Sequence, residues 1–210
     1  MTNPKNKSDQ FSKTCLNYVH SWIKEQPEFY NRRYEFKSKY TDKGNSCENE
    51  SIEFASRFYE WGMVEKNIQW KSNEYFTGEC DIELKDSIED IKNSWSQKTF
   101  PLFDTEIPVD GYGWQLQGYC DLWDKPQGGL IYTLMDAPES IIDKESYYKA
   151  KDLGLEETPL ELYEEVKSYM TYSNLSDELR IKRFFVDRDQ VLIESVYQRV
   201  EQIRNYINNL

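Results

Sequence analysis

The sequence predicts an α/β protein in which a mixed central β-sheet is flanked by helices. Apolar residues recur at helical spacing near both ends of the chain, two neighbouring strands follow Asn73, and residues 129–135 form a continuous apolar run. Such a run is typical of a strand that is covered on both faces, in the middle of a sheet. Helices and strands in this mixed order favour a layered α/β domain.

The composition excludes a disordered chain. The 210 residues carry 26 Lys and Arg against 38 Asp and Glu, a formal charge of -12, and 15% of them are aromatic. This length suits one compact domain, and a disordered acidic chain would lack the aromatic side chains that supply burial here. The net charge argues, on its face, against a partner made of phosphate.

The sequence predicts neither a membrane-spanning segment nor a framework of disulfide bonds. Its first residues, MTNPKNKSDQFSKT, are polar, and no stretch approaches the roughly 20 apolar residues that a membrane span requires. We therefore expect a cytoplasmic protein. The cysteines are far apart and form no CxxC pair, so they predict reduced thiols rather than a zinc or redox site. They are Cys15, Cys47, Cys80 and Cys120.

A first helix is predicted at residues 14–25, because apolar side chains recur there at helical spacing, and Pro27 stops it. The chain around this helix, residues 1–42, is expected to form a basic helical extension. The basic residues of this region, together with the next lysine, are Lys5, Lys7, Lys13, Lys24, Arg32, Arg33, Lys37, Lys39 and Lys43.

A second helix is predicted at residues 46–59. Asn45 or Ser46 is its cap, and glutamates occupy its early turns, where the helix dipole favours negative charge. From Asn73 onward the residue pattern changes from the helical period to the period of an extended strand. Residues 74–84 and 87–92 predict two neighbouring strands joined by a Lys-Asp turn.

The remaining elements follow in mixed order. A helix at residues 111–123 precedes the apolar strand at 129–135, and the acidic segment 136–167 predicts a helical insertion or lid. A last strand at 180–186 leads into a long amphipathic helix, in which apolar residues recur at steps of four and three. They are Leu192, Val196, Val200, Ile203 and Ile207.

Charged side chains gather on the two neighbouring strands. Residues two apart on a strand point to the same side, so Asp90 and Lys92 project together while Ile91 turns into the core. A strand pairing that places Asp81 beside Asp90 brings two carboxylates and an ammonium within a few ångströms. That arrangement is costly unless a cation completes it.

Magnesium fits such a group. Hard divalent ions take carboxylate and carbonyl oxygens, and one or two carboxylates often hold them together with phosphate oxygens of the substrate. A lysine near such an ion can orient or deprotonate an attacking water and stabilise the negative charge that develops on phosphorus. These residue types therefore favour Mg²⁺ or Mn²⁺ as the cofactor.

The order and spacing of these residues resemble a known superfamily. The pattern G-x-x-D, eight further residues, D-x-K, and then Q-x-x-x-Y on a helix resembles the PD-(D/E)XK nucleases. Within them the chain is similar to the YqaJ/lambda-exonuclease-like recombination exonucleases of phages. The likeness covers residues 43–135 and implies a restriction-endonuclease-like core. The residues that carry it are Gly78, Asp81, Asp90, Lys92, Gln115 and Tyr119.

The resemblance implies a set of metal ligands. Asp81, Asp90 and the backbone carbonyl of Ile91 are implied to bind the ion, and the preceding stretch KGNSCENESI is similar to the helix that supplies one further acidic ligand. Glu48 is favoured for that role over Glu50. The chain departs from the commoner pattern at Asp90, where Glu is usual, and this shortens the ligand's arm by one methylene.

The other motif residues are implied to support the reaction. Lys92 is implied to be the catalytic lysine, Gln115 to help position Lys92 or the scissile phosphate, and Tyr119 to complete the motif and contact DNA. Taken alone, Gln115 and Tyr119 are more simply explained as a pair that hydrogen-bonds on one helix face.

A polar run, residues 93–99, follows Lys92 directly. Its hydroxyls, amides and cation suit contacts with backbone phosphates that do not depend on base sequence, and an ordinary polar loop explains the run equally well. The candidate DNA-binding residues here are Ser94, Ser96, Lys98 and Thr99.

Several other residues are expected to be structural. Trp95, Trp114 and Trp123 are expected in the core rather than as platforms for base stacking. The single histidine, His20, is expected to be structural, which leaves no basis for zinc hydrolysis through histidines or for a Ser-His or Cys-His triad. The absence of a GxxxxGK[ST] motif argues against an ATPase.

The sequence therefore predicts a Mg²⁺- or Mn²⁺-dependent deoxyribonuclease, an exonuclease for phage or prophage recombination or DNA end processing. The resemblance implies DNA, a phage single-strand annealing protein and further copies of the chain as partners, in the cytoplasm of a bacterial host. Two alternatives share the fold. One is a catalytically silent binding or inhibitory protein, which the acidic surface suits, and the other is a structure-specific endonuclease.

The predicted organisation is a single nuclease domain over residues 1–210. It consists of the basic extension at 1–42, a catalytic core at 43–135, an acidic helical insertion or lid at 136–175, and a closing strand and helix at 176–210.

Overall fold

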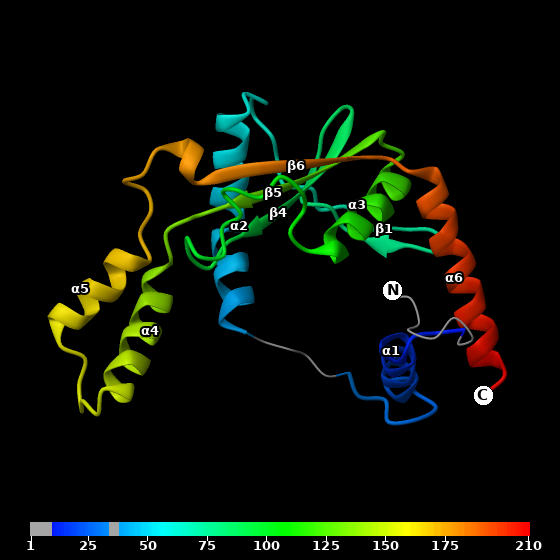
Figure 1. Ribbon diagram of the computed structural model, residues 1–210, viewed down its shortest axis with the longest axis horizontal. Helices are drawn as coiled ribbons and strands as arrows, with labels where there is room; N and C mark the ends of the chain where they lie inside the picture. Colours follow the sequence, from blue (N-terminus) through cyan, green and yellow to red (C-terminus); the bar gives the residue numbers. More distant parts are fainter. Residues whose placement is uncertain (1–9, 34–37) are drawn as a thin grey trace. The chain divides into compact units, whose positions relative to one another are not determined.

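The computed structural model describes residues 10–33 and 38–210, and Figure 1 shows their helices and strands. Contacts divide the chain into two compact units, residues 1–37 with 199–210 and residues 38–198. Each unit is described by itself below. Of the basic residues singled out in the sequence, those outside the described residues are Lys5, Lys7 and Lys37.

The smaller unit packs α1 (Lys13–Lys24) against the last part of α6 (Gln190–Asn208). Apolar side chains from both helices form its core, with Val19 among the buried ones. His20 belongs to this packing, because its Nε2 lies 2.8 Å from the hydroxyl of Tyr206. The histidine is therefore structural, as predicted.

The larger unit is built on a four-stranded sheet in the order β3-β4-β5-β6 (Figure 1). The central strands β4 and β5 are parallel and both outer pairs are antiparallel, which confirms the predicted mixed sheet. Parallel neighbours need a crossover connection, and α3 supplies it. The strands are β3 (Ile82–Glu83), β4 (Ser87–Asn93), β5 (Gln127–Thr133) and β6 (Ile181–Asp187).

Helices cover both faces of the sheet. α2 (Lys39–Phe58) contributes to a buried cluster with Ile91 and the neighbouring strands, and α3 (Asp110–Trp123) contributes to a second cluster with Ile88. Because side chains alternate along β4, residues of odd number face α2 and residues of even number face α3. Asp90 therefore lies on the α3 side.

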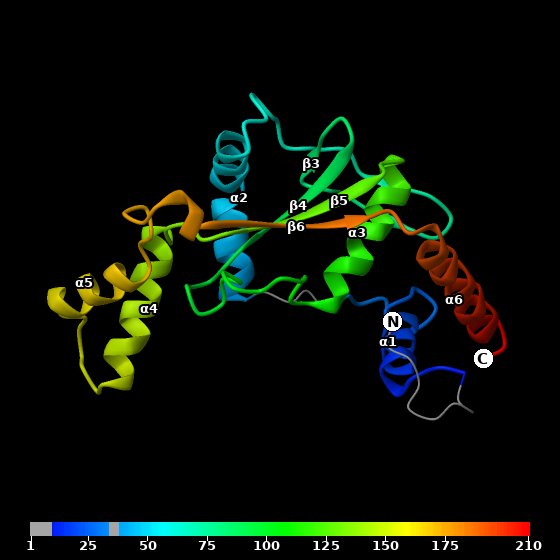
Figure 2. The same ribbon diagram turned by 45° about the horizontal axis from the view of Figure 1, so that its top comes forward.

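The acidic segment after β5 is helical, as predicted, and its two helices form a hairpin. Its helices, α4 (Glu139–Asp152) and α5 (Leu160–Tyr169), lie side by side (Figure 2). Trp95 packs against their apolar faces. Asp136 closes the base of the hairpin, because its Oδ1 accepts the N–H of Tyr172 at 2.5 Å and that of the next residue at 2.9 Å.

The strand predicted at residues 74–84 is broken into two. Its first part forms β2 (Thr77–Gly78), which pairs with β1 (Lys71–Ser72) in a separate small sheet, and its last part forms β3. Asn73 causes a tight turn between β1 and β2, because its side-chain oxygen accepts backbone N–H groups two and three residues on, at 2.9 and 2.7 Å.

The second helix begins at Lys39 and not at residue 46, so the predicted start was wrong. Ser38 is the cap: its hydroxyl accepts the N–H of Thr41 at 3.3 Å, while the Thr41 hydroxyl accepts the N–H of Ser38 at 3.1 Å. This is a capping box in which threonine stands where Glu or Gln is usual. Residues 39–42 thus belong to the helix that enters the core.

Trp123 is buried in the core, as expected, but Trp114 is 40% exposed, so the expectation for Trp114 was wrong.

A short 3-10 turn, η1 (Asp177–Leu179), precedes β6. All four cysteines are free and buried. Among the helices of the described residues, none combines the length and the apolar character that crossing a bilayer requires.

Candidate active site

The candidate site lies where the edge of β4 is left without a neighbouring strand. β3 pairs only with the first part of β4, with Ile82 opposite Glu89 and Glu83 opposite Ile88. In the described part of the chain no strand lies beside this edge from Asp90 onward. The backbone groups on that stretch of edge are open to other partners.

Asp81 takes the place of the missing strand. Its N–H donates to the carbonyl of Glu89 at 3.1 Å, and its Oδ2 accepts the N–H of Ile91 at 2.5 Å. The N–H and carbonyl of one strand residue face the same neighbour, so the Ile91 carbonyl also faces this edge. The register of β3 on β4 puts Asp81 level with Asp90, as expected, and its contacts with Glu89 and Ile91 lie on either side of Asp90.

Asp90 and Lys92 lie together on the α3 side of β4, as predicted. Asp90 is only 2% exposed, and its Oδ2 lies 2.5 Å from the Lys92 ammonium. The Lys92 Nζ lies 5.2 Å from the centroid of the Tyr112 ring on α3. Ile91, between the two charged residues, turns into the core on the α2 side.

Gln115 joins α3 to this charged pair. Its Nε2 donates to the Tyr119 hydroxyl at 2.8 Å and reaches Asp90 Oδ1 at 3.4 Å. The glutamine therefore orients Asp90, while its contact with Tyr119 matches the simpler explanation of the motif. Tyr119 in turn packs against Gly78, where an added Cβ would lie 2.8 Å from the ring. The glycine of the sequence pattern thus makes room for its tyrosine.

The two aspartates share an environment that opposes their ionisation. Burial, and next the negative charge of Asp90, raise the pKa of Asp81 to about 7, and Glu48 adds to the effect. Burial also raises the pKa of Asp90, although Lys92 opposes the shift. A bound cation would relieve this repulsion.

Lys92 remains a cation in this arrangement. Burial alone would lower the pKa of Lys92, but its ion pair with Asp90 outweighs burial and raises it. The ammonium therefore balances part of the negative charge of the aspartates.

The donor set fits a hard divalent cation. Apart from the ion pair with Lys92, the buried Asp90 Oδ2 has no hydrogen-bond partner in the described residues. Asp81, Asp90 and the Ile91 carbonyl supply the oxygen ligands that Mg²⁺ prefers, with room for water and phosphate oxygens. No cluster of three or more His, Cys, Asp or Glu side chains is assembled for a metal in the described residues.

The third candidate carboxylate, that of Glu48, is paired with a lysine and does not cluster with the carboxylates of Asp81 and Asp90. Its Oε2 lies 2.5 Å from the Nζ of Lys66, a residue of the loop after α2. Glu48 nevertheless lines the same cavity as Asp81 and Lys92, whereas Glu50 is exposed and does not line it. The structure thus places Glu48 at the site and Glu50 outside it.

A cavity of about 460 Å³ opens in front of these residues. The predicted DNA-binding residues divide around it: Ser94 and Thr99 line this cavity, whereas Ser96 and Lys98 line a second one. Tyr119 lines neither of them and lies by a smaller pocket, of about 350 Å³, with Gln115. The α2 residues on the first cavity are Tyr40, Thr41, Gly44, Asn45, Glu48 and Ser51.

Two further residues of the site were not predicted. Lys66 lies in an irregular loop and gives no periodic signal. Tyr112 lies on the same helix face as Gln115 and Tyr119, at a spacing of three and then four residues, so helical periodicity could have identified it.

Comparisons with known proteins agree with this fold. No family model matches the chain, and no curated protein matches it. Among solved structures, a phage-related exonuclease from Haemophilus somnus 129PT matches with a TM-score of 0.76 and 25% identity, over 98% of this chain and 87% of that one.

Two structures of LHK-Exo, an alkaline exonuclease from Laribacter hongkongensis, match with lower identity. The complex with dAMP has a TM-score of 0.60 at 14% identity and covers 95% of this chain and 83% of that one. The other structure has a TM-score of 0.59 at 12% identity and covers 96% and 83%. The fold of the chain is thus that of phage-related and alkaline exonucleases.

Proposed function

We propose that the chain is a divalent-metal-dependent deoxyribonuclease that degrades DNA from an end. The observation that carries the proposal is the group of Asp81, Asp90 and Lys92 on the open edge of β4, within a fold shared with exonucleases. Two desolvated carboxylates beside a lysine favour phosphodiester chemistry over a purely structural role.

Each residue has a distinct task in the proposed mechanism. Asp81, Asp90 and the Ile91 carbonyl would hold the ion, with Glu48 as a further ligand. When bound, the ion supplies Lewis acidity and lowers the pKa of an attacking water. Lys92 stays protonated and stabilises the negative charge that develops on the phosphate oxygens.

Gln115 acts through Asp90. Its amide N–H to Asp90 and its hydrogen bond with Tyr119 hold the aspartate in one orientation on the strand. Asp81 is held in the same way by the Ile91 N–H. Both carboxylates are therefore fixed before substrate arrives, which lowers the cost of reaching a reactive geometry.

The substrate and the biological setting are also proposals. LHK-Exo has been crystallised with dAMP, which supports a nucleotide or DNA ligand for this fold. The likeness to a phage-related exonuclease supports a part in phage recombination or DNA end processing. We propose a single-strand annealing protein and further copies of the chain as its partners in this role.

Digestion of end-labelled linear duplex DNA with Mg²⁺ tests the proposal. We expect the unmodified protein to release nucleotides and the Asp90→Ala, Lys92→Ala double variant to release none. Glu50→Ala is the matched control, because this exposed glutamate of α2 lies outside the cavity. Closed circular DNA should resist, since an exonuclease needs an end. Unchanged activity of the double variant would refute the mechanism.

A catalytically silent binding protein is the second candidate. The ion pair between Glu48 and Lys66 favours it, because a lysine there already balances the carboxylate that a metal would use. The strongly negative net charge favours it as well. This candidate predicts no hydrolysis by the unmodified chain under any divalent ion.

A further inference from the structure

A second cavity lies between the loop after β4 and the hairpin of α4 and α5. Its volume is about 450 Å³, which falls within the range of about 300–1,000 Å³ typical of small-molecule sites. Trp95 lines both this cavity and the one in front of Asp81 and Lys92. The two cavities are therefore neighbours that share Trp95 in their linings.

The second cavity has an apolar and aromatic lining. Val166, Met170 and Tyr172 are buried along it, while Tyr169 lies at its exposed rim. Flat aromatic side chains of this kind stack on nucleobases whatever the sequence, because every base has a π face.

Polar groups at the cavity suit the edge of a base. The Tyr172 hydroxyl donates to the Tyr169 carbonyl at 2.7 Å and also lies 3.1 Å from Gln97 Oε1. Within the described residues, the amide nitrogen of Gln97 has no hydrogen-bond partner. A side-chain amide can both donate to and accept from a base edge, so Gln97 offers a hydrogen bond where the aromatic rings offer stacking.

The charge around the cavity is compatible with DNA. Glu145 is balanced by Lys39 at 2.8 Å, and Lys149 pairs with Glu165 at 3.0 Å. Lys98 makes no ion pair in the part of the chain that the structure describes, and it lies at the rim. Its ammonium is thus the uncompensated charge at this cavity.

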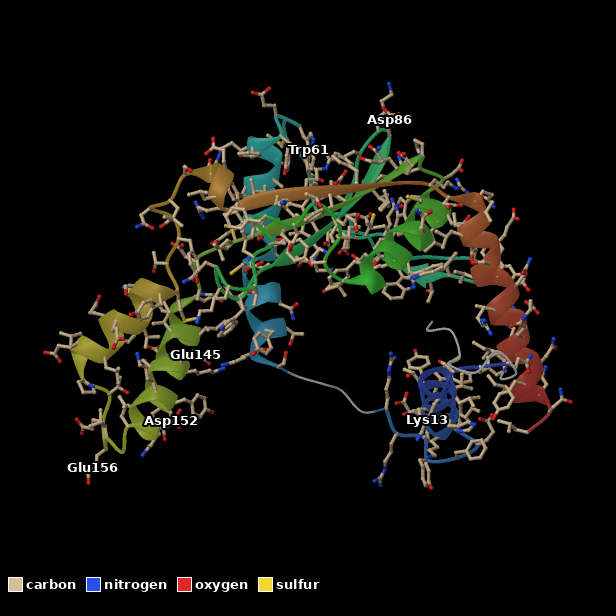
Figure 3. All side chains as sticks on the ribbon, viewed as in Figure 1. Lys13, Trp61, Asp86, Glu145, Asp152 and Glu156 are labelled. Atoms are coloured by element: carbon tan, nitrogen blue, oxygen red, sulfur yellow. The ribbon has the colours of Figure 1, made fainter. Side chains whose placement is uncertain are left out.

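The acidic end of the hairpin lies elsewhere. Figure 3 labels Glu145 beside the start of α2, whereas Asp152 and Glu156 lie at the far end of the hairpin from the sheet. These two carboxylates therefore lie away from the part of the hairpin that lines the second cavity.

We propose that the second cavity binds a nucleobase of the DNA strand whose phosphate lies beside Lys92. This inference rests on the proposed nuclease function and adds a substrate subsite to it. Trp95 follows Lys92 by three residues, so their Cα atoms are at most about 11 Å apart. A short single strand can span that distance, with its base between the aromatic rings and its backbone near Lys98.

Fluorescence of 2-aminopurine tests the subsite. Single-stranded oligonucleotides carry this base at successive positions near one end, and a matched set is abasic at the same positions. Binding is measured with the Lys92→Ala protein, so that the DNA is not degraded. Tyr169→Ala removes an exposed ring at the rim, and Tyr148→Ala removes an equally exposed ring of α4 that does not line the cavity.

We expect Tyr169→Ala to weaken binding of the base-containing oligonucleotide by about fivefold or more and to reduce quenching at one position. Binding of the abasic oligonucleotide should not change, and Tyr148→Ala should affect neither. Equal losses for both oligonucleotides would refute the base site. Unchanged binding in Tyr169→Ala would also refute it and would favour a protein partner at this cavity.

The two proposals fail in different ways. If the unmodified protein does not degrade DNA, the proposed function is wrong. If it degrades DNA but Tyr169→Ala binds both oligonucleotides as the parent protein does, only the base subsite is wrong.

Discussion

Lys43 is only 1% exposed, although a lysine side chain usually keeps its charge in water. Its ammonium donates to the carbonyls of Ser94 and Trp95 at 2.9 and 3.2 Å. Burial lowers the pKa of Lys43 to about 8, and the nearby Cys47 and Asp136 limit the shift. The lysine thus fastens α2 to the loop that lines both cavities.

Replacement of this lysine should loosen that loop. Lys43→Met keeps the side-chain length but leaves two carbonyls without their donor, and we expect the free energy of unfolding to fall by about 1–3 kcal/mol. Urea denaturation measures the loss. Lys39→Met removes a surface ion pair with Glu145 and an ammonium that lies 4.9 Å from the centroid of the Trp95 ring, and it should cost only about 1 kcal/mol. Equal losses would show that Lys43 has no special role.

Asp136 predicts a pH dependence of stability. Burial alone would raise the pKa of Asp136, but the N–H groups of Tyr172 and Ser173 outweigh burial and hold the pKa below its ordinary value. The ionised carboxylate therefore stabilises the fold above the ordinary carboxyl pKa, and this contribution disappears as the pH falls through the lower, folded value.

Asp136→Asn should expose this contribution. We expect the variant to be less stable than the parent near neutral pH, and the difference to shrink as the pH falls below about 4. Urea denaturation at a series of pH values measures it. A difference that stays constant with pH would contradict the assigned role of the charge.

At the scale of residues, the sequence predicted the site where the geometry is local. Asp90, Ile91 and Lys92 follow the alternation of one strand, so their directions needed no knowledge of the fold. Asp81 lies just before β3, and the register of that strand on β4 puts it beside Asp90, as the expected strand pairing required. The ion pair of Glu48 with Lys66 joins a helix to an irregular loop, and no local pattern encodes it.

At the scale of the secondary-structure elements, a buried ion pair joins β4 to β6 across the strand between them, β5, and holds the two strands in register. Glu89 is fully buried; both of its carboxylate oxygens contact the Arg183 guanidinium, and Ser87 donates to it at 2.7 Å. Gly129 on β5 leaves room for this carboxylate, since an added Cβ would lie 1.8 Å from Glu89 Oε2. Glu89 adjoins Asp90, so the ion pair also fixes the strand that carries the site.

Gly129→Ala should therefore destabilise the protein. The partners of Glu89 hold it in place, so the added methyl group forces the strands apart, at a cost of about 1–3 kcal/mol in unfolding free energy. Thermal or urea denaturation measures it. Gly113→Ala is the control: nothing lies within 4 Å of its added Cβ, and alanine in a helix should stabilise by up to about 1 kcal/mol. A neutral Gly129→Ala would contradict the packing described.

The predictions of helices and strands were most accurate where one residue pattern extends over many positions. The amphipathic closing helix and the apolar strand were found because many residues repeat one pattern. The start of α2 was missed because Thr41 replaces the usual acidic partner in its capping box. The break of residues 74–84 depends on a single Asn73 turn, and the pairing of Glu89 with Arg183 joins residues far apart in the chain.

At the scale of the molecule, the chain has a net charge of -12, and the basic side chains of β6 near the site do not offset it. The basic residues on and around β6 are engaged within the fold. Arg183 pairs with Glu89, and Arg188 pairs with Asp121 and Asp124. Lys182 and Arg180 bond to backbone carbonyls as well. These residues are not available to neutralise phosphates.

DNA binding should therefore depend on divalent ions. Without them we expect weak binding of linear DNA that falls further as salt increases, because few phosphates are neutralised. With Ca²⁺, an oxygen-seeking ion, binding should strengthen. Fluorescence anisotropy of labelled DNA at several salt concentrations measures both effects. Tight metal-free binding at physiological salt would contradict this account of the charge.

Calorimetric titration with Mn²⁺ tests the central claim most directly, because it measures the site without requiring catalysis. The account predicts that the unmodified protein binds Mn²⁺, that Asp81→Asn and Asp90→Asn each lose this binding while remaining folded, and that Glu50→Gln binds as the parent does. Absence of Mn²⁺ binding by the unmodified protein, or equal binding by the aspartate variants, would contradict the assignment of Asp81 and Asp90 as metal ligands.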